Sequence, residues 1–224
     1  MKTNKILNLS LIVVLFCFGC NFKKDSKHEE AFETYNILST LNNYITTTKM
    51  VFFALPAPPP AKGINLDSVI DSNRKKDTIK LINALIKKNG KLIVTIDSEL
   101  IPPILSEIKK EKIQRCLKLN FEETYNSFGS LKKKSNIDVS QIKMNDYSII
   151  IPYKDYYEKK KIKGYGKLNI SLNFSRIAFN KNHTKAIVIM GARFGKLNSF
   201  SAIYFLEKEK EKWVIRCENG LTIS

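Results

Sequence analysis

The sequence predicts an α+β fold, in which N-terminal helices pack on a C-terminal antiparallel β-meander. Two patterns carry this prediction. Over residues 29–50, apolar residues recur every three or four positions, which is the spacing of one helix face. From residue 147 onward, short apolar or alternating runs are separated by turn sequences, as in consecutive strands. The chain has 224 residues, of which 43% are hydrophobic, so it can bury one core and is neither a disordered tail nor a fibre.

The first half of the chain is expected to hold three helices. In the first, Glu29, Glu30 and Glu33 stand in the opening turns, where the helix dipole favours negative charge. In the second, Asp77 is a suitable N-cap and Gly90 ends the helix. The expected segments are helices over residues 29–50, 78–89 and 104–120, a helical turn over 66–70, an extended proline-rich stretch over 56–60 and a strand over 91–96, whereas residues 121–141 show no clear pattern.

The last third of the chain predicts a run of short strands. Apolar and polar residues alternate over residues 168–174, with Ser171 and Asn173 on the polar side, as in a strand with one buried face. The apolar positions then change parity, which predicts a bulge or bend near Ser175. Gly191 is interpreted as a turn or bulge glycine. The expected strands cover residues 147–151, 168–174, 186–190, 200–206 and 213–215.

The N-terminus has the layout of a secretory signal peptide. Lys2 and Lys5 precede an apolar run that ends at Gly19. This run is too short to cross a bilayer comfortably as a permanent helix, which needs about 20 apolar residues. We therefore expect residues 1–19 to be removed on export.

Within this segment, Cys17-Phe18-Gly19-Cys20 resembles the lipobox of bacterial lipoproteins. The resemblance implies that signal peptidase II cuts before Cys20, which then carries diacylglycerol and a further acyl chain such as palmitate. Several acyl chains, each contributing about 0.8 kcal/mol per buried methylene, hold a protein at a membrane without spanning it. Because residue 21 is Asn and not Asp, the resemblance favours the outer membrane of a Gram-negative bacterium.

The implied organisation has three parts: a signal peptide over residues 1–19, the lipidated Cys20 with a tether over 20–28, and a single α+β globular domain over 29–224. The C-terminal strands and turns are similar to the ends of small uncharacterised bacterial lipoproteins, from which no activity carries over. The expected location is therefore the cell envelope, with the protein anchored by lipid.

Two cysteines remain once Cys17 has left with the signal and Cys20 carries lipid. In an oxidising envelope, Cys116 and Cys217 either form a disulfide that closes a long loop or stay as buried free thiols, and the sequence leaves both alternatives open. The chain has neither a CxxC motif nor a Cys/His ligand set, so no metal site and no cofactor are expected.

The chain is strongly basic, with 38 Lys and Arg against 21 Asp and Glu and a net charge of +17. Export would remove the charges of Lys2 and Lys5 and leave +15. In an envelope this charge favours anionic partners such as lipid headgroups or envelope polymers, and not nucleic acid. Because 33 of the 38 basic residues are Lys, which lacks the bidentate fork of Arg, the charge predicts a solvated lysine-rich surface.

Catalytic motifs are absent from the sequence. The two histidines, His28 and His183, fall in the expected tether and in an expected hairpin turn, where neither is placed as the base of a nucleophile. Paired carboxylates could still hydrolyse glycosidic bonds. The candidates are Glu122 with Glu123, and Asp97 with Glu99.

One segment has the character of a binding surface. It mixes tyrosines, whose flat faces suit sugar rings or a headgroup boundary, with lysines that would meet phosphate or carboxylate. The alternative is a lysine-rich loop between two strands whose tyrosines pack on the sheet. This Tyr/Lys segment comprises Tyr153, Lys154, Tyr156, Tyr157, Lys159, Lys160, Lys161, Lys163 and Tyr165.

Together these observations favour a membrane-anchored envelope lipoprotein that serves as a non-catalytic binding or structural module. Its expected partners are the membrane, through the lipid anchor, and an anionic envelope polymer or glycan, whereas no protein partner is identified. Two alternatives remain: a hydrolase of an envelope polymer that uses paired carboxylates, and an inhibitor or immunity protein directed against a secreted enzyme.

Overall fold

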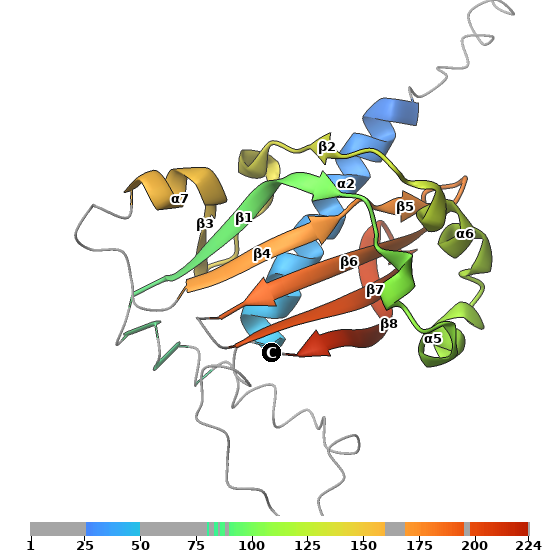
Figure 1. Ribbon diagram of the computed structural model, residues 1–224. Coiled ribbons are helices and arrows are strands. Elements are labelled where there is room, and N and C mark those ends of the chain that lie inside the picture. The colour runs from blue at the N-terminus through green and yellow to red at the C-terminus, as the bar shows by residue number, and fades with distance from the viewer. Residues whose placement is uncertain are drawn as a thin grey trace, which may run out of the picture. The chain divides into compact units, whose positions relative to one another are not determined.

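A mixed, eight-stranded sheet forms the centre of the fold, and helices lie on both of its faces (Figure 1). The computed structural model describes residues 26–49, 80, 83–84, 86–87, 90–159, 169–194 and 198–223. Glu33–Ser224 form one compact unit, and Met1–Phe32 form another, of which the start of helix α2 is described. The fold class is α+β, as the sequence predicts.

The described helices and strands follow one another in a simple order. They are α2 (Ser26–Tyr44) with a π-helical turn (Ile45–Lys49), β1 (Leu92–Ile101), a 3-10 turn (Leu105–Glu107), α5 (Lys110–Leu117), α6 (Glu122–Ser130), β2 (Ser135–Asn136), a 3-10 turn (Val139–Gln141), β3 (Ser148–Pro152), α7 (Tyr153–Lys159), β4 (Asn169–Ser175), β5 (Ala178–Phe179), β6 (Lys185–Arg193), β7 (Ser199–Glu209) and β8 (Lys212–Ile223).

The expected antiparallel meander makes up most of the sheet. Strands β4, β6, β7 and β8 are neighbours in this order, and each pair is antiparallel. Strand β1 continues the sheet beyond β4, but it runs parallel to both β3 and β4. A parallel pair needs a long crossover connection, and here the chain between β1 and β4 contains α5, α6 and α7. The sheet is therefore mixed, whereas the sequence predicted only antiparallel pairing.

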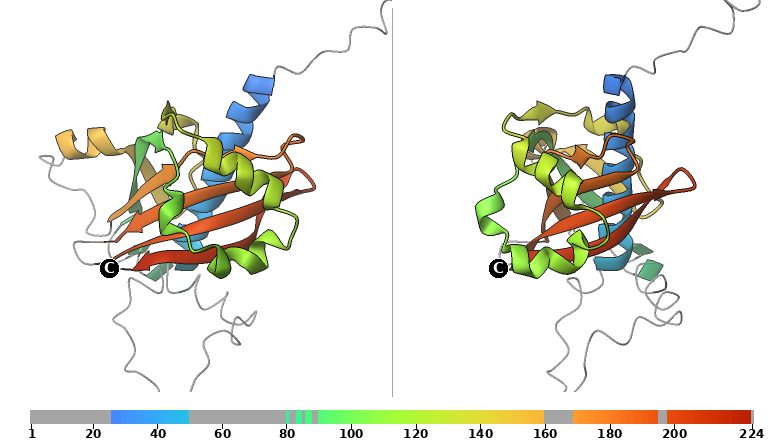
Figure 2. Two further views of the ribbon diagram at one scale, coloured as in Figure 1. Left: turned by 45° about the vertical axis from the view of Figure 1, so that its right-hand side comes forward. Right: turned by 90° about the vertical axis from the view of Figure 1, so that its right-hand side faces the viewer.

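The core has two layers, one on each face of the sheet. Alternate residues of the strands, such as Leu172, Val188 and Tyr204, pack with the buried face of α2. The residues between them, such as Ile187 and Phe205, pack with α5 and α6 on the opposite face. Figure 2 shows α2 on one side of the sheet and the short helices α5 and α6 on the other.

Helix boundaries differ from the prediction in the middle of the chain. The helix expected over residues 104–120 is a 3-10 turn followed by α5, and residues 121–141, which show no clear pattern, contain α6. Gly90 ends the preceding helical segment as predicted, because it has a φ of 81° and its amide donates to the Ile86 carbonyl at 2.8 Å. None of the helices in the described residues is long and apolar enough to cross a membrane.

Several expected features lie outside the described residues. These are the signal segment with Cys20, the proline-rich stretch over residues 56–60, the helical turn over 66–70 and most of the helix over 78–89, of which residues 80, 83, 84, 86 and 87 are described as helical.

A disulfide joins the two cysteines whose state the sequence left open. Cys116 of α5 and Cys217 of β8 are bonded, with Cα atoms 5.6 Å apart and a sequence separation of 101 residues. Cys116 is fully buried in the cluster between the sheet and α5 and α6. The bond therefore ties α5 to the edge strand β8.

A buried carboxylate holds α2 to the β7–β8 hairpin. Glu33 is 2% exposed, and it accepts hydrogen bonds from Lys208 Nζ and from Trp213 Nε1, both at 2.7 Å. Burial alone raises the pKa of Glu33, but the hydrogen bonds from Lys208 and Trp213 outweigh it and lower the pKa below its ordinary value. Glu33 is therefore the anionic member of a buried ion pair with Lys208.

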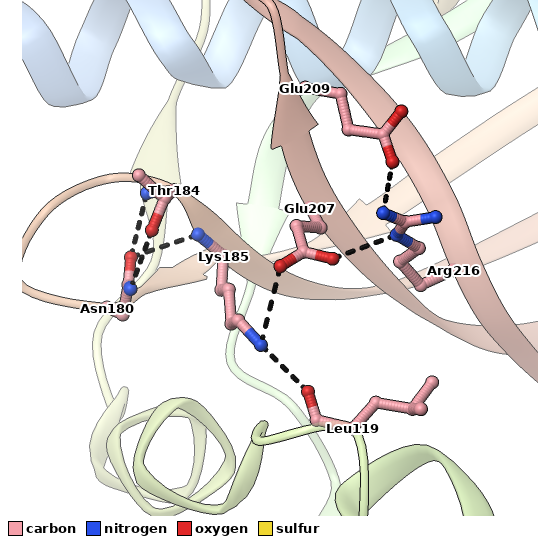
Figure 3. Close-up of polar contacts among 7 residues, drawn as sticks. All are labelled: Leu119, Asn180, Thr184, Lys185, Glu207, Glu209 and Arg216. Atoms are coloured by element: carbon pink, nitrogen blue, oxygen red, sulfur yellow. Dashed lines mark hydrogen bonds and ion pairs between the residues drawn. The ribbon is translucent and has the colours of Figure 1, made fainter.

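A second polar network fastens the connection between α5 and α6 to the sheet (Figure 3). Lys185 Nζ donates to the Leu119 carbonyl at 2.7 Å and lies 3.6 Å from Glu207 Oε1. The other oxygen of Glu207 accepts from Arg216 Nε at 2.8 Å, and Arg216 also pairs with Glu209. Lys185 and Arg216 are thus committed to structural contacts.

Candidate functional site

Part of one sheet face is polar and open. The face that packs against α5 and α6 is apolar where these helices cover it, as at Ile187 and Phe205. Beyond the helices, the same face carries a pocket with a volume of about 340 Å³. Its lining residues are Asp97, Tyr153, Ser171, Leu172, Asn173, Gly191, Ala192, Arg193, Ser199, Phe200, Ser201 and Thr222.

The strand register arranges the polar lining residues in two rows across the sheet. In one row, Ser171 of β4 pairs with Arg193 of β6, which pairs with Ser199 of β7. In the other, Asn173 pairs with Gly191, Gly191 with Ser201, and Ser201 with Thr222 of β8. Since side chains alternate between the two faces of a strand, each row points away from α2.

Arg193 stands out among the arginines of the described chain. Arg115 donates to the Glu218 carbonyl at 3.5 Å, Arg176 donates to the Lys133 carbonyl at 3.0 Å, and Arg216 pairs with two glutamates. Among the described residues, the exposed Arg193 guanidinium has neither a hydrogen bond nor an ion pair. Its five donors are therefore available to a ligand in the pocket.

Two further lining side chains have unused hydrogen-bonding groups. Within the described part of the chain, neither the Ser171 hydroxyl nor the Asn173 carboxamide makes a hydrogen bond. Ser201 and Thr222 differ, because their hydroxyls share a hydrogen bond of 2.8 Å. The pocket thus offers donors and acceptors on two neighbouring strands, β4 and β6.

Gly191 shapes the floor of the pocket. It lies inside β6, paired with Asn173 and Ser201, and not in a turn or bulge as the sequence suggested. A Cβ atom at this position would collide with Asn173 Oδ1. The absence of a side chain therefore lets the Asn173 carboxamide lie across β6, and a glycine inside a strand often marks such a close approach.

Asp97 and Tyr153 line the pocket at its β1 side. Asp97 belongs to β1, where its Oδ1 accepts from the Glu99 amide at 3.1 Å. Tyr153 is the first residue of α7. The β1 side therefore adds one carboxylate and one aromatic ring to the hydroxyl and amide groups of the floor.

The Tyr/Lys segment contributes Tyr153 to the pocket, but its first part is not the loop that the sequence predicted. Residues Tyr153–Lys159 form helix α7, which includes Tyr157 and Lys159. Lys154 is exposed and Tyr156 is half-buried, and neither lines the pocket. The remaining members, Lys160, Lys161, Lys163 and Tyr165, lie outside the described residues.

Of the four candidate catalytic acids, Asp97 lines the pocket, and Glu99, Glu122 and Glu123 are not among its lining residues. Glu122 and Glu123 are exposed in the first turn of α6, outside the pocket. Glu99 is paired with Lys134 at 2.7 Å. Among the described residues that line the pocket, Asp97 is the one carboxylate, and no group of three or more His, Cys, Asp or Glu in the described chain could hold a metal.

The two histidines have no position in the pocket. His183 lies in the turn before β6 with a φ of 50°, and its ring meets the Phe179 ring edge-on at 5.2 Å between centroids. His28 is exposed in the first turns of α2. The turn position of His183 agrees with the prediction, whereas His28 belongs to α2, which begins at Ser26, and not to the tether expected over residues 20–28.

No protein-family model matches the chain, and neither the curated proteins nor the solved structures give a match. The site must therefore be interpreted from its own residues.

Proposed function

We propose that the protein is a lipid-anchored lipoprotein of the bacterial cell envelope that binds an envelope polymer in the pocket without catalysing a reaction. The anchor is supported by the sequence, in which Lys2, Lys5, an apolar run and the Cys17–Cys20 motif follow one another as in lipoproteins. The outer membrane is the proposed location, because residue 21 is Asn.

The binding function rests on one observation, the unused polar groups of the pocket. Strand positions on the face of a sheet usually carry packed or simply solvated side chains. Here Ser171, Asn173 and Arg193 converge on one concavity, and none of them has a partner among the described residues. Polar groups that converge in a pocket are the common mark of a ligand site.

The lining residues favour binding over hydrolysis. A glycosidase of the usual type needs two carboxyl groups on opposite sides of the bond that it cleaves. In the described part of the pocket, Asp97 stands without a second carboxylate. The rival proposal of a hydrolase is therefore less well supported, since Glu122 and Glu123 are exposed on α6 and Glu99, the partner proposed for Asp97, pairs with Lys134 and does not line the pocket.

Cell fractionation tests the anchor. We expect the wild-type protein to stay with the membrane after a high-salt wash and to dissolve in detergent. A Cys20→Ala variant cannot take up lipid and should appear in the soluble fraction, whereas Glu30→Ala, an exposed position outside the Cys17–Cys20 motif, is the control. Salt-resistant membrane binding of the Cys20→Ala variant would show that the anchor proposal is wrong.

Cosedimentation tests the binding function. The full-length protein in detergent micelles is mixed with purified cell-wall sacculi at low and at high salt. We expect sedimentation with sacculi that persists at high salt, because hydrogen bonds in a pocket are screened less than surface charges. Asn173→Ala should weaken it, and Asn126→Ala on the exposed side of α6 should not.

Two outcomes of this experiment would contradict the proposal. Binding that disappears entirely with salt would be the diffuse effect of the net charge. Absence of binding to sacculi at either salt concentration would favour a protein partner, as expected for an inhibitor or immunity protein.

A further inference from the structure

We infer that the polymer is an acidic polysaccharide, whose carboxylate pairs with Arg193 and whose hydroxyls bind Ser171 and Asn173. This inference rests on the proposed function, because it specifies the ligand class of the same pocket. Three features of the site support it: an arginine without a partner among the described residues, the hydroxyl and amide groups around it, and the length of the polar rows.

The arginine indicates an acidic group on the ligand. The planar guanidinium fork matches a carboxylate or phosphate in a bidentate fashion, which the point charge of lysine cannot do. The chain has 33 lysines and five arginines, and Arg193 is the arginine that lines the pocket. Other described arginines are used in structural contacts, as Arg216 is with Glu207 (Figure 3).

The groups beside Arg193 indicate a sugar. A sugar hydroxyl both donates and accepts, and so do the serine hydroxyl and the asparagine carboxamide. Ser171 lies directly across from Arg193, and Asn173 follows it on the same face of β4. Tyr153 lines the β1 side of the same pocket, where an aromatic ring can stack on the apolar face of a pyranose.

A peptide ligand fits the site less well. Extended peptides usually bind by adding a strand to the edge of a sheet, where main-chain groups are unpaired. Strands β4, β6 and β7 are internal, and each is paired with a neighbour on both sides. A ligand in the pocket must therefore be bound by side chains, because the main-chain groups of these strands are already paired.

The polar rows are longer than one sugar ring. From Asn173 on β4 to Thr222 on β8 the register crosses three strand-to-strand spacings, each about 4.8 Å, or roughly 14 Å in all. A site of this length suits consecutive units of a chain. Asp97 at the β1 side would repel an acid, so the carboxylate belongs at Arg193, in the middle of the site.

Calorimetry with defined oligosaccharides tests this inference. The full-length protein in detergent micelles is titrated with trigalacturonic acid, with neutral tri-N-acetylchitotriose and with a tripeptide, triglycine. We expect trigalacturonic acid to bind about tenfold more tightly than the neutral trimer, the difference of one charge-assisted contact. Triglycine, which has a carboxylate but no hydroxyls, should not bind measurably.

An arginine variant localises the effect. Arg193→Gln should reduce the preference for the acidic trimer to less than about twofold, because the fork is lost while hydrogen bonding to hydroxyls remains. Arg115→Gln removes the same charge from α5, outside the pocket lining, and should keep the preference for the acidic trimer. An unchanged melting temperature of the Arg193→Gln variant would show that its folding is intact, as expected for an exposed arginine with no partner among the described residues.

Three results would overturn the inference: equal binding of the acidic and neutral trimers, an Arg193→Gln variant with the wild-type preference, or tighter binding of triglycine than of either sugar. The experiments also distinguish a wrong ligand class from a wrong binding function. If sacculi sediment the wild-type protein but not Asn173→Ala, and trigalacturonic acid does not compete, the function stands and the acidic ligand is wrong. If sacculi do not bind at all, the function itself is wrong.

Discussion

The carboxamide of Asn173 lies over the backbone of Gly191, in the space where any other residue at position 191 would place its Cβ atom. The two residues are direct partners in the register of β4 and β6. Asn173 is exposed, and its side-chain carboxamide has no hydrogen-bond partner among the described residues. At the pocket floor, the missing side chain of Gly191 thus leaves room for the Asn173 carboxamide.

Gly191→Ala should therefore weaken ligand binding. The new methyl group displaces the Asn173 side chain, and the loss of one neutral hydrogen bond costs about 1 kcal/mol, or roughly fivefold in affinity. Cosedimentation with sacculi measures this loss of affinity. Gly220→Ala on β8 is the matched control, because a Cβ there would meet no atom within 4 Å. Equal losses in the two variants would contradict the role of the Asn173–Gly191 pair.

Local patterns in the sequence predict the strands well but not the pocket that they form. The alternation over residues 168–174 predicts β4 and puts Ser171 and Asn173 on its polar side. However, Arg193 comes next to Ser171 only through the register of β4 and β6, and Thr222 only through that of β7 and β8. Contacts between strands leave no periodic signal in a single sequence.

Two other differences between the prediction and the structure concern helix α7 and the pairing of β1. Helix α7 carries Asp155 in its first turn, where the helix dipole favours negative charge, but the dense Tyr and Lys composition suggested a loop. The parallel pairing of β1 with β4 could not be predicted, because the strand at residues 91–96 shows only that it is apolar and buried.

Loss of the disulfide should lower the free energy of unfolding markedly. Bridging residues 116 and 217 closes a loop of 101 residues, and removing such a bond typically costs about 2–5 kcal/mol. Urea unfolding of a Cys116→Ala/Cys217→Ala variant measures this. A reductant should destabilise the wild-type protein and leave the variant unchanged, whereas equal stability of the two proteins would contradict the prediction.

Glu33 should make the protein sensitive to acid. Its pKa is lowered in the folded state below the ordinary value of 4.5. A group with a lowered folded pKa stabilises the protein fully above its unfolded pKa and loses this contribution as the pH falls through the folded pKa. Glu33→Ala leaves Lys208 paired with Glu211 alone and the Trp213 indole without its acceptor, which should cost about 3 kcal/mol near neutral pH.

Urea unfolding at a series of pH values from 7 down to 3 checks this. The difference in unfolding free energy between wild type and Glu33→Ala should stay constant down to about pH 5 and then shrink. Glu30→Ala, an exposed residue of the same helix, is the control and should show little difference at any pH. A wild-type advantage that grows as the pH falls would contradict the buried ion pair.

Lys185 should stabilise the connection between α5 and α6. Its ammonium group donates to the Leu119 carbonyl, pairs with Glu207 (Figure 3) and lies 4.6 Å from the centre of the Phe121 ring. Lys185→Met keeps the aliphatic stem and loses these contacts, which should cost about 1–2 kcal/mol. Lys181→Met in the neighbouring turn, where the side chain is exposed, should be neutral in thermal unfolding.

The central claim is that a ligand binds at Arg193, and NMR of the arginine side chains tests it most directly. The chain has five arginines, so ¹⁵N-labelled full-length protein in detergent micelles gives few Nε–Hε signals, and an Arg193→Lys variant assigns the one in the pocket. On addition of soluble fragments released from sacculi by a muramidase, the Arg193 signal should shift and saturate. The signals of Arg115 and Arg216 should stay in place. Saturable shifts at those arginines with an unchanged Arg193 signal would contradict the account.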